Sequence, residues 1–296
     1  MTRVLVTGAD GRIGRAVIDL LVRSGFGVTA LSLEFTGSMS ADRVETGDAR
    51  SPDIVAHAAQ GADAIVHLAA IPHPSLGTPR EVFTSNVTST FTVLAEAGER
   101  GIQRVVLASS INAFGVPMNA HDVLPAYYPI DEDIPADIAD AYSLSKLTDE
   151  GSARMAHRRW GTDVVSLRFP FVGTRGDLLS RKANMELDPA SGAREGWSYL
   201  DRRDAAMAVL AALEARVEGA VVVGVSAEDP LVDASTGDLL ISFAPGVPVR
   251  RHIGPRESLV DTTRARTLLG FTPRHSIHRP DDEAVVKTSD RGALSA

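Results

Sequence analysis

Two side chains that could move a proton stand four positions apart in the segment AYSLSKLTDE, residues 141–150. Residues with this spacing are neighbours on a helix surface, so a helix here would hold Lys146 beside Tyr142. A free phenol has a pKa near ~10, and a neighbouring ammonium favours its charged form. The pair could therefore take a proton from a substrate hydroxyl, although the same spacing also occurs by chance on helix surfaces.

A glycine-rich turn near the start of the chain could bind a dinucleotide. In TGADGRIG, residues 7–14, three glycines follow the apolar run RVLVT and precede an apolar helical pattern. Such a turn lets the backbone approach a pyrophosphate, and the helix N-terminus offers unpaired N–H groups and a positive partial charge. The glycine spacing of three and three differs from the two and three of the more common dinucleotide motif.

Strand and helix patterns alternate along the first 170 residues. Buried strands are expected near 3–8, 28–33, 62–70, 104–110 and 163–169, and helices over 13–21, 86–100 and 142–159. Strands that alternate with helices indicate parallel pairing. We therefore predict an α/β fold, a Rossmann-type doubly wound parallel sheet with a smaller C-terminal substrate lobe.

The same patterns suggest where the domains divide. The dinucleotide-binding domain is expected over 1–169, with 201–226 returning to it. Residues 170–200 and 227–280 would form the substrate-binding lobe, because the alternation is lost there. The charged tail, 281–296, is expected to be disordered.

Composition limits the classes of function. The net charge is -8, whereas a nucleic-acid partner selects a basic face. The chain has no cysteine, which excludes disulfides and thiolate chemistry and suits the cytoplasm. No apolar run approaches the ~18 residues that cross a bilayer. We expect a cytoplasmic protein that binds a small molecule, with no nucleic-acid partner, no membrane partner and no metal site.

Seven motifs in this order resemble the extended short-chain dehydrogenase/reductase family, of the NAD-dependent epimerase/dehydratase type. They are TGADGRIG at 7–14, GDA at 47–49, HLAA at 67–70, NVTST at 86–90, LASSINAFG at 107–115, YSLSK at 142–146 and LRFPFVG at 167–173. The resemblance implies a Rossmann core, a bound nicotinamide cofactor and the catalytic set Ser110, Tyr142 and Lys146. Ser110 would hold the substrate oxygen, and Lys146 would also bind the nicotinamide ribose.

The resemblance also implies which residues lie along the cofactor. They are Gly8, Gly11, Arg12, Ile13, Gly14, Ser32, Asp48, Ala49, Leu68, Ala69, Ala70, Asn86, Tyr142, Lys146 and Pro170. A carboxylate at the end of the second strand would hold the ribose 2′-OH of NAD. Ser32 stands there instead, and Arg12 could meet a 2′-phosphate, so NAD and NADP both stay open with a small preference for NADP.

Three departures from the family pattern bear on the reaction. Dehydratases of the family carry an acidic pair directly after the catalytic serine, whereas Ile111 and Asn112 follow Ser110 here, which argues against a 4,6-dehydratase. Members that act on nucleotide sugars carry Asn and Arg where this chain has Phe171 and Trp197. Both changes remove polar partners of a diphosphate, which favours a smaller or less charged substrate.

Further residues are assigned to the substrate or to the packing. The candidate substrate contacts are His73, Ser75, Asn112, Phe171 and Arg175. Trp197 and Tyr199 are expected in the core. The segment PIDEDIPADIAD, 129–140, is expected to be a solvated acidic loop.

Three functions remain open on this reading. The first is an NAD(P)-dependent oxidoreductase that moves a hydride between nicotinamide and a small hydroxy/keto substrate such as a sugar or sugar acid. The second is a nucleotide-sugar epimerase that uses the same hydride step, and the third is a non-catalytic cofactor-sensing regulator. The family resemblance also implies a homodimer formed through the helices expected over 86–100 and 142–159.

Overall fold

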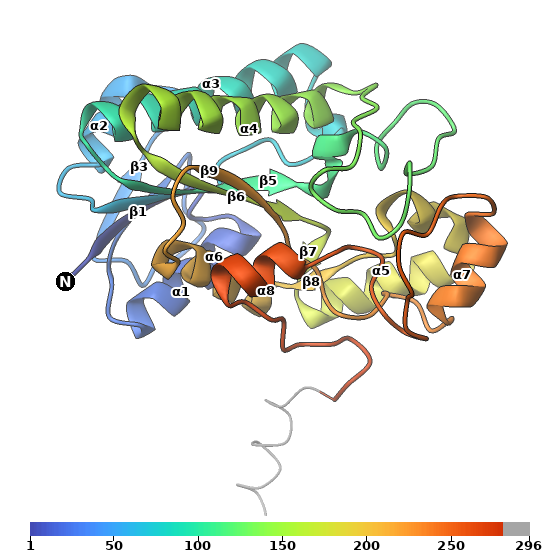
Figure 1. Cartoon of the computed structure of the whole chain (residues 1–296). Coiled ribbons are helices and arrows are strands. Elements are labelled where there is room, and N and C mark those ends of the chain that lie inside the picture. Colours follow the sequence, from blue (N-terminus) through green and yellow to red (C-terminus); the bar gives the residue numbers. More distant parts are fainter. Residues whose placement is uncertain (281–296) are drawn as a thin grey trace, which may run out of the picture.

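Seven strands form one parallel sheet in the computed structural model, which describes residues 1–280 (Figure 1). The strands are β1 (Arg3–Thr7), β2 (Gly27–Ser32), β3 (Arg43–Thr46), β4 (Ala64–His67), β5 (Arg104–Ser110), β6 (Asp163–Phe169) and β9 (Ala220–Gly224). Their order is β3-β2-β1-β4-β5-β6-β9, so the chain reverses direction across the sheet between β1 and β4. This confirms the predicted doubly wound α/β fold. The tail expected to be disordered lies outside the described residues.

Each strand buries alternate side chains on opposite faces of the sheet. In β1, Val4 and Val6 face one core, and Leu5 faces the other. In β5, Val106 faces the first core, whereas Val105 faces the second. Both faces are therefore apolar, as a parallel sheet covered by helices requires.

Helices cover both faces of the sheet (Figure 1). On one face lie α2 (Pro52–Ala58), α3 (Pro79–Glu99) and α4 (Ala141–Trp160); on the other lie α1 (Arg12–Arg23), α6 (Arg202–Glu214) and α8 (Thr263–Leu269). The helix expected over 86–100 is longer than predicted because Thr78 and Glu81 form a capping box at its start. The extra length brings its first turns beside the segment that follows β4.

A third apolar core lies beyond the C-terminal edge of the sheet. It is built around Trp197, Tyr128 and Tyr199, which are fully buried. The elements around it are the two-stranded sheet of β7 (Val172–Gly173) and β8 (Leu200–Asp201), the helices α5 (Arg175–Leu187) and α7 (Thr236–Phe243), and the 3-10 helices η2 (Ile111–Phe114) and η3 (Pro189–Glu195). Because this core also takes in Ile111 and Phe114, the segment after β5 packs with the C-terminal residues. The domain boundaries given above stay predictions.

The acidic segment 129–140 is a loop in which Asp133 and Asp137 are exposed, as expected from its sequence, but other side chains anchor it to the protein. Ile130 and Ile134 are buried in the third core. The backbone N–H of Gly224 donates to Glu132 Oε1 over 2.6 Å, and Arg264 lies 3.4 Å from the same carboxylate. Burial raises the pKa of Glu132. The segment therefore ties the end of β9 to α8.

Candidate active site

The glycine turn after β1 forms a cradle that side chains would fill. Gly8 has φ +67°, and a Cβ added to it would lie 2.6 Å from the backbone nitrogen of Ala69. A Cβ on Gly14 would lie 2.3 Å from the carbonyl oxygen of Gly8. α1 begins at Arg12, and its N-cap, Gly11, supplies no side-chain hydrogen bond to the first turn. The free N–H groups and the lack of side chains fit a pyrophosphate at this helix end.

Replacement of Gly8 by alanine should weaken NAD binding and destabilise the fold by ~1–3 kcal/mol. The new methyl would be strained at positive φ and would push against the segment after β4. Gly25→Ala is the matched control, because Gly25 has φ +85° but no atom within 4 Å of an added Cβ. Calorimetric titration with NAD should show a loss of affinity for Gly8→Ala alone; equal affinities in the two variants would contradict the cradle.

The structure brings Tyr142 and Lys146 together in the first turns of α4. Asp140 caps this helix by accepting a hydrogen bond from the Ser143 backbone over 2.8 Å. Tyr142 is only 6% exposed, and its ring centroid lies 5.9 Å from Lys146 Nζ. Within residues 1–280 the Tyr142 hydroxyl has no hydrogen bond, so it is available to a bound molecule.

Lys146 also links this helix to the strand that ends in Ser110. Lys146 Nζ donates to the Ala108 carbonyl of β5 over 2.9 Å. Ser110 is the last residue of β5, and its Oγ accepts hydrogen bonds from the backbone and side-chain nitrogens of Asn112 over 3.1 and 2.9 Å. Asn112 Oδ1 is buried without a partner among the described residues. The three predicted catalytic residues therefore come from one corner of the fold, where β5 meets α4.

A buried ion pair fixes α4 against β5 and β6. Arg168 donates to both oxygens of Glu150, over 2.8 and 2.9 Å. Ser109 Oγ donates to Glu150 Oε1 over 2.7 Å. Since Glu150 lies two turns after Tyr142, this network sets the position of the phenol relative to the sheet.

The other predicted cofactor residues line the carboxyl edge of the sheet or support it. Ile13 lies in the first turn of α1, Ala49 is buried after β3, Leu68 and Ala70 flank Ala69 after β4, and Pro170 joins β6 to β7. Asn86 is 1% exposed; its Nδ2 donates to Ile71 O and Ser145 Oγ, and its Oδ1 accepts from Ile71 N. Its amide therefore holds the segment after β4 against α3 and α4.

Of the residues expected near the adenosine end of the cofactor, Ser32 and Asp48 lie at or just after the carboxyl ends of the neighbouring strands β2 and β3, whereas the Arg12 side chain turns toward β7. Hydrogen bonds from Arg50 to Asp48 lower the pKa of that carboxyl. Ser32 ends β2 and is half-buried. Arg12 points elsewhere: it donates to the Val172 carbonyl over 3.1 Å and lies 5.6 Å from the Phe171 ring centroid.

The arginine that reaches the segment after β2 is Arg15, which sequence reasoning missed. It is paired with Asp10 and donates to the Ser38 carbonyl over 3.2 Å. Asp10 in turn accepts hydrogen bonds from the backbone and hydroxyl of Thr36. The signal for this contact was weak, because Arg15 lies outside the glycine motif and meets residues more than twenty positions away.

The predicted substrate contacts fall into two groups. His73 and Ser75 are exposed and hydrogen-bonded to each other over 2.7 Å in the 3-10 helix η1 (Pro74–Leu76) region, so they hold a local turn. Phe171 lies between the guanidinium groups of Arg12 and Arg181, at 5.6 and 4.5 Å from its ring centroid. Arg175 donates to the Ile277 carbonyl over 3.3 Å. Phe171 and Arg175 thus flank β7, and Asn112, the fifth predicted contact, donates to Ser110.

Trp197 and Tyr199 are core residues, as expected. Trp197 Nε1 donates to the Pro189 carbonyl over 2.7 Å. The Tyr199 hydroxyl donates to Asp229 over 2.6 Å and accepts from the Ile277 backbone over 2.9 Å. Both aromatic side chains are fully buried, so neither offers a surface to a ligand.

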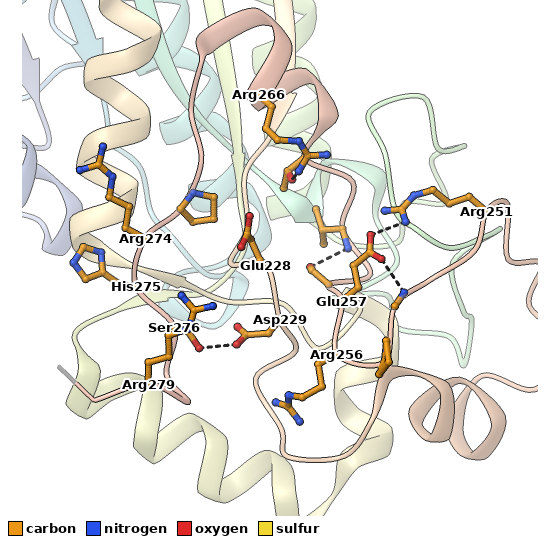
Figure 2. Close-up of a pocket in the computed structure, with 16 residues that line it drawn as sticks. Glu228, Asp229, Arg251, Arg256, Glu257, Arg266, Arg274, His275, Ser276 and Arg279 are labelled. Carbon is orange, nitrogen blue, oxygen red and sulfur yellow. Dashed lines mark hydrogen bonds and ion pairs between the residues drawn. The ribbon is translucent and has the colours of Figure 1, made fainter. Parts of the chain in front are cut away.

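A separate cavity of about 600 Å³ opens between α8 and the C-terminal segments (Figure 2). Its basic lining residues are Arg251, Arg256, Arg266, Arg274, His275 and Arg279, and its carboxylates are Glu228, Asp229 and Glu257. The carboxylates are partly engaged: Glu257 binds Arg251, and Asp229 accepts from Ser276. No member of the catalytic set lines this cavity.

The geometry and the sequence comparison point to one family. The profile described as the NAD dependent epimerase/dehydratase family matches residues 4–224, which include the glycine cradle, Ser110 and the Tyr142–Lys146 pair. The chain belongs to this family. It is therefore an NAD-dependent enzyme, and its family likeness covers the whole seven-stranded sheet.

Relatives over most of the chain are sugar-metabolising enzymes. UDP-glucose 4-epimerase from Corynebacterium glutamicum is 26% identical over 93% of this chain and 92% of its own length. L-Arabinose 1-dehydrogenase (NAD(P)(+)) from Haloferax volcanii is 28% identical over 67% of this chain and 77% of its own. The structure of MoeE5 in complex with UDP-glucose and NAD has a TM-score of 0.69, with 25% identity and coverage of 99% and 100% of the two chains.

Two further observations concern partners. Every helix within residues 1–280 is too short or too polar to cross a bilayer. In the same residues, no three histidine or carboxylate side chains converge as metal ligands would.

Proposed function

We propose that this protein is an NAD-dependent oxidoreductase of a small hydroxy/keto substrate such as a sugar or sugar acid. The observation that carries the proposal is the Tyr142–Lys146 pair, buried at the start of α4 and joined to β5 through the Ala108 carbonyl. Because β1 and β5 are parallel strands of one sheet, the glycine cradle and Ser110 lie at the same sheet edge. A dinucleotide with its pyrophosphate at the cradle can extend along that edge toward the pair.

The reaction follows from the chemistry of these groups. Ser110 Oγ holds the substrate hydroxyl by a hydrogen bond, and the Tyr142 phenolate accepts its proton while the C=O bond forms. Lys146 places its ammonium beside the phenol and would hold the nicotinamide ribose by a hydrogen bond. NAD, when bound, would supply the acceptor for the hydride of the carbinol carbon. In the reverse direction Tyr142 returns the proton to the carbonyl oxygen.

The positions of Arg12 and Arg15 favour NAD over NADP as the cofactor. Arg12 gave the preference for NADP, but its guanidinium lies at Val172. Arg15 is the cation near that segment, and Asp10 already neutralises it. We expect NAD to raise the melting temperature more than NADP does at equal concentration, because at a given concentration the ligand that binds more tightly stabilises the folded protein more. A larger rise with NADP would contradict this assignment.

A substrate screen tests the proposed reaction. Aldoses, uronic acids and hydroxy acids are incubated with the protein and external NAD, and the absorbance of reduced nicotinamide is followed. We expect steady cofactor reduction with at least one member of these classes. Absence of any reduction, together with interconversion of UDP-sugars without net cofactor change, would contradict the oxidoreductase and support an epimerase.

A nucleotide-sugar epimerase is the second candidate. The likeness to UDP-glucose 4-epimerase favours it, and so does the arginine-lined cavity, whose cations could hold a diphosphate (Figure 2). Phe171 and Trp197 argue against it, since both occupy positions where the family carries polar side chains. The hypothesis of a non-catalytic regulator is not kept, because the chain belongs to a family of NAD-dependent enzymes and a protein that only senses the cofactor has no need of the Tyr142–Lys146 pair.

We expect the protein to form a homodimer. This expectation rests on the family resemblance and on the outer face of α3 and α4. Phe91 on α3 and Leu144 on α4 are 48% and 43% exposed. Exposed apolar side chains on two adjacent helices fit a helix-on-helix contact with a second copy. The cytoplasmic location also stays a prediction.

A further inference from the structure

A buried carboxylate lies beside the lysine of the proposed acid/base pair, yet takes no part in the proton transfer. Asp149 follows Lys146 by three residues on α4, and its Oδ2 lies 3.5 Å from Lys146 Nζ. The side chains of Asp149 and Lys146 are only 4% and 5% exposed. Opposite charges at this separation interact more strongly here than at a hydrated surface.

The groups around Asp149 leave Lys146 as its cationic neighbour. On α4 it faces Lys146 and Glu150, and from α3 it faces the Thr90 hydroxyl. Burial raises the pKa of Asp149, while Lys146 and Thr90 counter that rise and Glu150 adds to it. His67 on β4 lies 3.3 Å from Thr90, but burial and the charge of Lys146 lower the pKa of His67 to about 3. His67 is therefore neutral.

A contribution to stability does not explain why a carboxylate stands at position 149. Lys146 already donates to the Ala108 carbonyl. Asp149 Oδ1 is buried and has no hydrogen-bond partner within residues 1–280. A buried oxygen without a partner reduces stability, and an apolar side chain of similar volume would pack there without that loss. Its effect on Lys146 is the more direct explanation.

We infer that Asp149 is a positioning residue that holds the Lys146 ammonium and reduces the positive charge that Tyr142 experiences. The inference rests on the proposed function, in which Tyr142 and Lys146 act as a pair. An ammonium favours the phenolate, and a carboxylate bound to that ammonium opposes it. Asp149 thus sets the pH at which the Tyr142 phenol loses its proton.

Absorbance titration of tyrosinate tests the inference without any substrate. The chain has four tyrosines. Burial and the Asp131 carboxylate raise the pKa of Tyr127 to about 12, and burial raises the pKa of Tyr128 and Tyr199 as well. The transition that is missing from Tyr142→Phe identifies the ionisation of Tyr142.

We expect Asp149→Asn to lower the midpoint of that transition by about one pH unit, the size of shift that one nearby charge produces. Asp149→Leu should give the same shift and serves if the asparagine variant does not fold. Asp133→Asn is the matched control, because it removes a carboxylate whose side chain is 75% exposed and which does not contact Lys146. Its midpoint should match that of the unmodified protein.

A double-mutant cycle separates an effect through Lys146 from a direct one. If Asp149 acts on Tyr142 through Lys146, the shift that Asp149→Asn produces should be lost in a Lys146→Met background. An unchanged midpoint in both Asp149 variants, or an equal shift with and without Lys146, would overturn the inference. The titration contains no substrate, so its result does not depend on turnover. If the substrate screen found no turnover, that result would count against the proposed function and not against the role of Asp149.

Discussion

Tyr142→Phe should leave the protein folded and able to bind NAD, but should slow turnover ~10²–10⁴-fold, which is the usual contribution of a positioned acid/base group. The phenyl ring keeps the packing of a side chain that is 6% exposed, and the lost hydroxyl has no hydrogen bond within the described residues. Proton transfer from the substrate hydroxyl then has no acceptor. Steady-state rates with the best substrate of the screen, together with NAD affinity by calorimetry, would measure both effects.

The matched control for this variant is Tyr127→Phe. Tyr127 is also buried, and its hydroxyl donates to Asp131 over 2.6 Å, but it lies outside the Tyr142–Lys146 pair. Its loss should lower stability and leave the rate per folded molecule unchanged. Equal rates for Tyr142→Phe and the unmodified protein would show that another group carries the proton.

Glu150→Ala should destabilise the protein by ~3–5 kcal/mol, the usual result of leaving one partner of a buried ion pair alone. Arg168 would lose both of its charge-assisted hydrogen bonds, and Ser109 would lose its acceptor. This loss is large against a typical stability of ~5–15 kcal/mol. Urea unfolding followed by circular dichroism would measure it.

An exposed ion pair supplies the comparison for Glu150→Ala. Asp133 binds Arg264 over 2.9 Å at the surface, and such pairs contribute ~0–1 kcal/mol. Asp133→Ala should therefore unfold at nearly the same urea concentration as the unmodified protein. If Glu150→Ala did the same, the buried pair would not be what fixes α4.

Local patterns were sufficient to predict the strands β1, β2, β4, β5 and β6 and the helices α1, α3 and α4, whereas the strand β3 and the helix α2 were missed. The strands are short apolar runs ended by glycine or polar residues, and α1 shows helical spacing from Ile13 to Leu21. The start of α3 was missed although Thr78-Pro79-Arg80-Glu81 carries a capping signal, because the apolar pattern before Asn86 is weak. The Tyr142–Lys146 contact was predictable because it depends only on helical spacing.

Contacts between distant parts of the chain could not be predicted in the same way. Glu132 reads as one of several charges in an acidic run, and only the fold brings it to Gly224, 92 residues away. Arg12 turns toward β7, 160 residues later, and Arg15 instead contacts the segment after β2. Asp149 has the helical spacing to reach Lys146, but its burial depends on how α3 packs against α4.

A crystal structure of the NAD complex would test the proposed chemistry most directly. We expect the pyrophosphate at the Gly8–Gly14 turn, the nicotinamide ring beside the Tyr142 hydroxyl, and Lys146 Nζ within ~2.7–3.2 Å of a ribose oxygen. A nicotinamide ring bound away from α4, with neither Tyr142 nor Lys146 in contact with the cofactor, would contradict the assignment of this pair to hydride-coupled proton transfer.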